Sequence, residues 1–245
     1  MSSNDSGRDA VREWRLSAYE ELRKARPDLF ENPQDAAYEI VTDRDLQDRV
    51  VAQSVSWNIE NGVPEQYADL GIVYEDAYIT VVKDAVRFRS GHLGPYVRIV
   101  PTKTAATAGA AVLPLHDGRV VLVRHFRHAS RAWHWEIPRG FGNAGEDAAN
   151  VARREVSEEL DAQVLKLVPL GPVRMDGGAS SDLPVLYLAE ITAPGNLETE
   201  EGIDEIRLVT VRDLKQMVTG GELEDAFTLS ALAYADAGGL LSDAR

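Results

Sequence analysis

The chain has 245 residues, 44% of them hydrophobic, and a formal net charge of −14. This length suits one large domain or a domain with an appendage, and the negative charge argues against non-specific binding to nucleic acid or to an anionic membrane. Because the chain contains no cysteine, disulfides, thiol catalysis and cysteine-based zinc sites are excluded.

No targeting signal is visible in the sequence. Residues 1–9 are polar and lack the apolar core of a signal peptide. No apolar run approaches the length needed to cross a bilayer. We therefore expect a soluble cytoplasmic protein with neither a membrane nor a nucleic acid as its partner.

The first part of the chain has helical patterning. Residues 1–10 are expected to be disordered, and apolar residues then recur with helical spacing. Helices are predicted over residues 10–24, 35–41 and 43–51, followed by an Asn-Gly turn at Asn61. We assign residues 1–65 to an N-terminal helical extension. It carries no chemical motif, so packing or dimerisation is its expected role.

The next segment changes to a β pattern. Strands are predicted at residues 78–83, 86–88 and 96–100, the last of them after a Gly-Pro turn at Gly94. We assign residues 66–107 to a small antiparallel sheet that is a possible dimerisation region.

Residues 108–245 alternate between strands and helices. Asp117-Gly118 is a strong hairpin signal between strands 108–115 and 120–126. Beyond the segment that carries the acidic motif, strands are predicted at residues 164–173, 183–191 and 205–211, and closing helices at residues 212–218 and 228–237. The expected architecture is α/β, with a mixed sheet flanked by helices.

A dense acidic motif lies between Gly140 and Ala162. Glu155 and Glu159 are one helical turn apart on the same face, with Glu158 beside them. Clustered carboxylates repel one another, and a divalent cation that prefers oxygen ligands is an effective compensation. A solvated helix with Glu–Arg pairs is the alternative.

The spacing favours the cation. The segment reads G-x5-E-x7-R-E-V-S-E-E-L-D-A and resembles the Nudix box, G-x5-E-x7-R-E-U-x-E-E-x-G-U, in which U is aliphatic. The resemblance implies an α/β/α sandwich and a Mg²⁺ cofactor, with Mn²⁺ as an alternative. It also implies that the metal is held by Glu155, Glu159, Glu158 and the backbone at Gly140, while Arg154 orients the glutamates.

A second resemblance concerns the substrate. The segments around the box are similar to those of ADP-ribose and nucleoside-diphosphate-sugar pyrophosphatases, which carry an acidic loop and form homodimers. The resemblance implies a catalytic base in residues 200–207, and Glu201 is favoured over Asp204 and Glu205. Three further residues are named as candidates for substrate binding, namely Arg124, Arg127 and Trp135, with strand or core packing as their alternative role.

Two positions depart from these patterns. Asp161 replaces the second glycine of the box, at a helix end where a left-handed conformation is common. The Gly- and Ser-rich loop 176–184 lacks the proline that is usual after the box in the ADP-ribose group. We expect the first change to cost about 1 kcal/mol or less and the second to alter specificity.

The sequence thus predicts a Mg²⁺-dependent hydrolase of a nucleoside diphosphate linked to another moiety, either ADP-ribose or a nucleotide sugar. One alternative is hydrolysis of nucleoside triphosphates or dinucleoside polyphosphates. The other is a ligand sensor of the same fold without catalysis. The box glutamates argue against the sensor, because all of them are intact.

Overall fold

The computed structural model describes residues 3–102, 109–196 and 202–241. The chain divides into two compact units: Met1–Thr102 with Gly177–Ser181, and Lys103–Asp176 with Asp182–Arg245. The domain boundaries at residues 65 and 107 stay predictions. No helix among the described residues is both long and apolar enough to cross a membrane.

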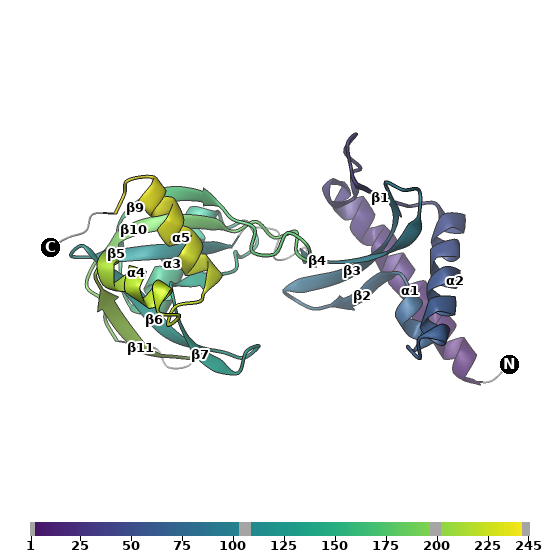
Figure 1. Ribbon diagram of the computed structural model, residues 1–245, viewed down its shortest axis with the longest axis horizontal. Coiled ribbons are helices and arrows are strands. Elements are labelled where there is room, and N and C mark those ends of the chain that lie inside the picture. Colours follow the sequence, from purple (N-terminus) through teal and green to yellow (C-terminus); the bar gives the residue numbers. More distant parts are fainter. Residues whose placement is uncertain (1–2, 103–108, 197–201, 242–245) are drawn as a thin grey trace. The chain divides into compact units, whose positions relative to one another are not determined.

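The first unit combines helices with a small antiparallel sheet (Figure 1). Its β3 strand pairs with all the other strands of this sheet and forms its longest register with β4. In chain order its elements are α1 (Ser3–Ala25), η1 (Pro27–Phe30), β1 (Tyr38–Ile40), α2 (Arg44–Glu60), η2 (Glu65–Ala68), β2 (Gly71–Glu75), β3 (Ile79–Phe88) and β4 (Leu93–Pro101).

A buried polar network fixes α1 on this sheet. The Tyr19 hydroxyl donates to Asp84 Oδ1 at 2.7 Å, and Arg98 Nε donates to Asp84 Oδ2 at 2.7 Å. The Arg98 guanidinium also lies over the Phe30 ring, 4.9 Å from its centroid. Because the Asp84 carboxylate is buried yet paired on both oxygens, its desolvation is compensated.

Three local predictions for this unit were wrong. Residues 35–41 do not form a helix, because the Ile40 backbone pairs with β3. The Asn32 side-chain amide also donates to the Ile40 carbonyl and accepts from the Ile40 N–H. Helix α1 begins at Ser3 instead of after disordered residues, since extending a formed helix costs little. Pro95 lies within β4 and not in a turn, because β4 is an edge strand and an edge strand tolerates a residue without a backbone N–H. The turn before β4 contains Gly91 instead, at φ +84°.

The segment Gly177–Ser181 belongs to the first unit although it follows the box in sequence. The Ile99 amide donates to the Ala179 carbonyl at 2.7 Å, and the Ser181 amide donates to the Ile99 carbonyl at 3.0 Å. This segment is the middle of the loop for which altered specificity was predicted. It forms a turn followed by an isolated bridge between Ser180 and Ile99 of β4.

The second unit is a mixed sheet between helices (Figure 1). Its main strand order is β11-β6-β5-β10-β9, in which β10 and β5 are parallel and the other neighbours are antiparallel. Its elements are β5 (Ala110–His116), β6 (Arg119–Arg127), β7 (Ala132–Glu136), β8 (Arg139–Gly140), α3 (Ala148–Leu160), β9 (Val164–Pro172), β10 (Val185–Ile191), β11 (Ile203–Val209), α4 (Val211–Thr219) and α5 (Ala226–Ala237).

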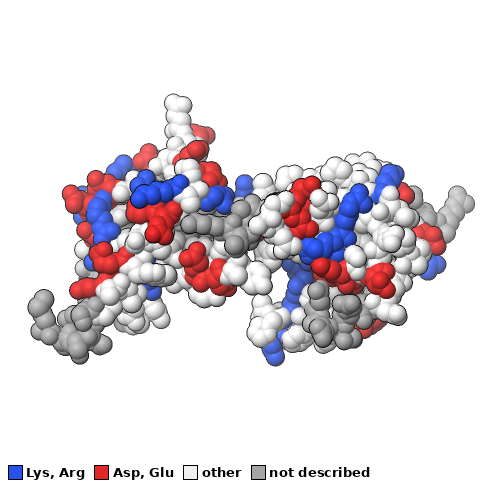
Figure 2. Space-filling model, turned by 180° about the vertical axis from the view of Figure 1, so that it is seen from behind, with Lys and Arg blue, Asp and Glu red and all other residues white. Residues whose placement is uncertain are grey.

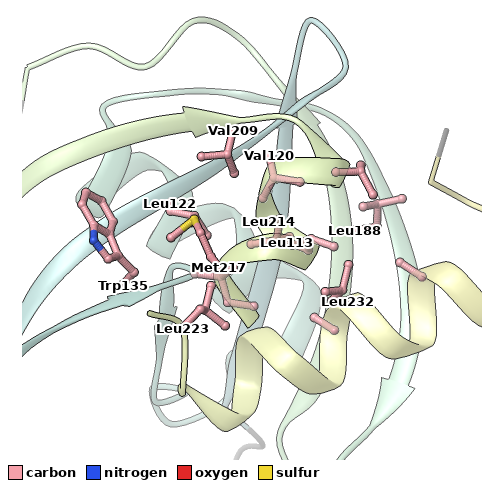
Figure 3. Close-up of a cluster of buried hydrophobic side chains, with 14 of the residues drawn as sticks. Leu113, Val120, Leu122, Trp135, Leu188, Val209, Leu214, Met217, Leu223 and Leu232 are labelled. Atoms are coloured by element: carbon pink, nitrogen blue, oxygen red, sulfur yellow. The ribbon is translucent and has the colours of Figure 1, made fainter. Parts of the chain in front are cut away.

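Alternating apolar residues let this sheet bury both faces. Leu113 and Leu122 point toward α4 and α5, where they pack with Leu214 and Met217 (Figure 3). On the other face, the neighbouring β5 and β6 residues pack against the apolar stripe of α3. Helices therefore cover both sides, and the predicted α/β/α sandwich with a mixed sheet, preceded by a small antiparallel sheet and N-terminal helices, is confirmed.

The hairpin between β5 and β6 also forms as predicted. Leu115 pairs with Val120 and His116 with Arg119. Asp117 and Gly118 have φ values of +48° and +72°, and this pair of left-handed residues is the turn that Asp-Gly favours.

Candidate active site

Helix α3 presents the acidic motif because one of its sides is anchored in the core. Asp147 caps the helix by accepting from the Asn150 amide at 2.8 Å. Val156 and Leu160 are fully buried against the sheet. Since residues one turn apart share a face, this packing fixes the direction of the glutamates on the adjoining face.

Glu155 and Glu159 are both buried, and they lie beside the glycine that opens the motif. Each is only 5% exposed. A Cβ atom at Gly140 would overlap the Glu155 carboxylate, so any larger residue there would displace this carboxylate from its present position. The structure therefore brings together three of the four residues predicted to bind metal.

The Glu159 carboxylate is under-compensated among the described residues. Its Oε2 atom is buried without a hydrogen-bond partner there. Burial raises the pKa of Glu159 well above its ordinary value, and the charges of Glu155 and Glu136 raise it further, while Arg127 and the Arg139 backbone amide lower it. An orphaned carboxylate oxygen next to further carboxylates is the environment that a bound cation would compensate.

Arg154 connects the remaining acids of the motif. Its guanidinium donates to Glu155 at 2.6 Å, to Glu158 at 2.7 Å and to Glu146 at 3.2 Å. It also donates to the Phe141 carbonyl at 2.8 Å, which ties the glycine-rich loop to α3. Arg154 thus contacts three glutamates of the motif, and its role in orienting them stays a prediction.

These residues fit a Mg²⁺-like cation, although they do not form a complete cage. Among the residues that the structure describes, no three His, Cys, Asp or Glu side chains converge in a metal-binding arrangement. Glu155 and Glu158 instead contact Arg154. This limited protein set suits Mg²⁺, which keeps several waters and is commonly completed by substrate phosphates.

Sequence reasoning missed a buried acid, Glu136, at the end of β7. Arg127 donates two hydrogen bonds to its carboxylate, His125 Nδ1 lies 3.3 Å from it and Arg139 lies 3.5 Å from it. Burial raises the pKa of Glu136, but the neighbouring His125 ring, the bonds from Arg127 and the charge of Arg139 outweigh it and lower the pKa to about 2. The sequence offered one sign of this buried acid, namely an acidic residue between two large apolar residues.

Replacing Glu136 with glutamine should destabilise the second unit. The change leaves the Arg127 and Arg139 guanidinium groups without their carboxylate partner, and we expect a loss of about 3 kcal/mol in the free energy of unfolding. Urea denaturation followed by circular dichroism would measure it. A loss below about 1 kcal/mol would mean that Glu136 is not the centre of this network.

A cleft of about 530 Å³ opens beside this network. Arg127, Glu136 and Arg139 line one part of it, and His134 and Glu224 line another. The charge of Glu136 and the backbone amide of Arg139 both act on the pKa of Glu159, in opposite directions. The cleft therefore lies beside residues that act on the acidic motif within the same unit, and its lining contains both arginines and acids.

The other candidates for substrate contact occupy two different environments. Arg124 donates to Asp204 at 2.8 and 2.5 Å, and it lies over the ring of Trp133, which is 45% exposed. Trp135 instead lies in the core under Arg207 (Figure 3). This burial favours core packing, the alternative role named for Trp135, and its substrate role stays a prediction.

The three candidates for the catalytic base are not all described. Glu201 lies outside the described residues. Asp204 accepts both hydrogen bonds from Arg124, which lower its pKa, so it is a poor proton acceptor near neutral pH. Glu205 lies 3.7 Å from Arg124. The preference for Glu201 stays a prediction.

Asp161 adopts the left-handed conformation expected at the second box glycine, with φ and ψ both +46°. Its carboxylate accepts from the Asn196 amide at 3.2 Å.

Asp161→Ala should therefore destabilise the protein by about 1 kcal/mol, since it loses the bond and keeps the strain. Asp161→Gly should be close to neutral in the same urea titration, because relief of strain offsets the lost bond; equal losses in the two variants would contradict this explanation.

Comparison with known proteins agrees with this geometry. The model of the NUDIX domain matches residues 105–228, so the chain belongs to the NUDIX domain family and is a Nudix hydrolase, a pyrophosphatase. The predicted family is confirmed.

The chain is also similar to two individual proteins. It is 30% identical over 129 residues to the ADP-ribose pyrophosphatase of Bacillus subtilis (strain 168), a match that covers 51% of this chain and 69% of that protein. The crystal structure of an ADP compounds hydrolase aligns with a TM-score of 0.60 and 18% identity, over 70% of this chain and 94% of the other. The second likeness concerns the fold alone.

Proposed function

We propose that the protein hydrolyses the diphosphate of a nucleoside diphosphate linked to another moiety, with ADP-ribose as the leading substrate and AMP and ribose 5-phosphate as products. The observation that carries the proposal is the pair of buried carboxylates, Glu155 and Glu159, packed against Gly140. The relative named ADP-ribose pyrophosphatase supports the choice of substrate.

Mg²⁺, or Mn²⁺ in its place, is the proposed cofactor. Glu155, Glu159, Glu158 and the Gly140 backbone would hold it. Two observations support this set: Glu159 Oε2 is buried without a partner among the described residues, and the charge of Glu155 acts on Glu159. When bound, the cation offsets the charge of the diphosphate and lowers the pKa of a coordinated water. Glu158 would first have to exchange its contact with Arg154, which is 2.7 Å away.

The protein's own residues would position the substrate. Arg154 holds Glu146, Glu155 and Glu158 in fixed relation, so the acidic face is formed before the substrate arrives. Arg127 lines the adjoining cleft, where its guanidinium would contact a phosphate oxygen. Arg124 would do the same only by releasing Asp204. Glu201 would accept the proton of the attacking water.

The small sheet of the first unit is the proposed contact in a homodimer. Tyr74 and Val97 lie on the same face of this sheet, at registers that β3 defines, and both are about half exposed. Sedimentation velocity at increasing protein concentration would test this. A species that remains the size of one chain at all concentrations would reject the dimer.

A substrate panel tests the proposed function. ADP-ribose, a nucleotide sugar, a nucleoside triphosphate and a dinucleoside polyphosphate would each be incubated with the protein and Mg²⁺, and the released monophosphate measured. We expect ADP-ribose to give AMP fastest. Cleavage of the triphosphate alone would reject the proposed substrate class, and no cleavage of any member would favour a ligand sensor.

A further inference from the structure

A second cavity lies in the first unit. It has a volume of about 630 Å³ and lies between α2, η2, β3 and the start of β4. Its size is within the range of pockets that hold small organic ligands. The α2, η2 and β3 residues that line it precede residue 105, where the match to the NUDIX domain begins, so the cavity is a feature of the N-terminal part of this chain.

The walls of this cavity are largely apolar and partly aromatic. Trp57 from α2 and Tyr67 from η2 line it, and these side chains are 58% and 62% exposed. Leu93 and Pro95 line it from β4. Large aromatic rings left open to solvent at a concave site can stack on a flat ligand while their polar atoms stay hydrated.

The charge of the cavity is opposite to that of the protein. None of its lining residues is Asp or Glu, whereas Lys83 and His92 are both among them. The chain as a whole carries a net charge of −14, and Figure 2 shows acidic and basic side chains interspersed on the described surface in view. A cationic cavity without a carboxylate in its wall selects anions.

Lys83 is the main source of this charge. Its ammonium group donates to the Tyr67 carbonyl and forms no ion pair with any of the described residues. Asp69, whose charge acts on Lys83, is itself paired with Arg15 at 3.2 Å. Burial lowers the pKa of Lys83 below its ordinary value. A half-buried ammonium group with one neutral partner has donors left for a ligand.

We propose that this cavity binds a small organic anion with a flat aromatic body, whose acidic group contacts Lys83 and whose ring packs against Trp57 and Tyr67. An inorganic anion would leave the apolar walls unused, and a neutral aromatic molecule would leave Lys83 unpaired. The site is distinct from the acidic motif and does not depend on the proposed hydrolysis.

A pair of matched probes tests this site. Anilinonaphthalene sulfonate carries an aromatic body and one negative charge, and phenylnaphthylamine has the same body without the charge. Fluorescence titration of the full chain should give saturable binding of the sulfonate with one site per chain. Lys83→Met should weaken sulfonate binding about tenfold and leave the neutral probe unchanged, because only the charged probe loses a charge-assisted hydrogen bond.

Two further variants complete the test. Trp57→Ala should weaken both probes, and Lys83→Arg, which keeps the charge, should retain most of the sulfonate affinity. Unfolding midpoints of all variants would show that the first unit stays folded. Unchanged sulfonate affinity in both Lys83→Met and Trp57→Ala would overturn the proposal. Equal weakening of both probes by Lys83→Met would also overturn it. A third contradicting result would be a second copy of the chain that covers the cavity, seen in sedimentation as a dimer that only Trp57→Ala dissociates.

Discussion

Replacing Glu159 with glutamine is expected to lower turnover of the best diphosphate substrate by about a hundredfold or more. The side chain is buried beside Glu155, and its Oε2 atom has no partner among the described residues. Glutamine keeps the shape but removes the negative charge that a divalent cation requires. The initial rate of monophosphate release, measured with saturating Mg²⁺, would show the loss.

Stability separates this effect from simple damage to the fold. Without added metal, Glu159→Gln should be at least as stable as the parent protein, because an uncompensated buried charge is removed. Glu190→Gln is the matched control, since Glu190 is exposed on β10 and pairs only with Lys166 in the described residues. Equal turnover in Glu159→Gln and the parent would contradict the assignment of the metal site.

Adding a single methyl group at Gly140 should lower turnover nearly as much as Glu159→Gln does. In Gly140→Ala the new Cβ atom would overlap the Glu155 carboxylate and force it away from Glu159. We expect a loss of about 1–3 kcal/mol in the free energy of unfolding, as for other overpacked sites, and a loss of activity similar to that of Glu159→Gln. Urea denaturation and the initial rate would measure the two effects.

A compensating change tests the steric reason. Aspartate at position 155 is one methylene shorter, so Gly140→Ala combined with Glu155→Asp should regain most of the lost stability. Activity should stay low, because the shorter carboxylate no longer reaches the same point. If the double variant is less stable than Gly140→Ala alone, the overlap with Glu155 is not the cause.

The sequence predicted the acidic motif well because its information is local. The spacing of Glu155 and Glu159, and the apolar stripe that ends at Leu160, together define two adjoining faces of one helix. Asp117-Gly118 likewise determined its own turn. Such features depend on residues within a few positions of one another, so they can be predicted from a single chain.

Features that depend on distant residues were not predictable in this way. Residues 35–41 have a helical pattern, but β3 and Asn32 supply hydrogen bonds that hold part of them as a strand. Glu136 became part of the candidate site only because the fold places its charge close to Glu159 of α3. The partners of Lys83 are likewise set by how α2 and η2 pack on the sheet.

The metal dependence of ADP-ribose cleavage tests the central claim most directly. Protein freed of metal with a chelator would be mixed with ADP-ribose, and AMP and ribose 5-phosphate would be quantified before and after addition of Mg²⁺. The proposed site requires equal amounts of both products after the addition and almost none before it. Product formation at the same rate without any divalent cation, or an intact substrate with Mg²⁺ and with Mn²⁺, would contradict it.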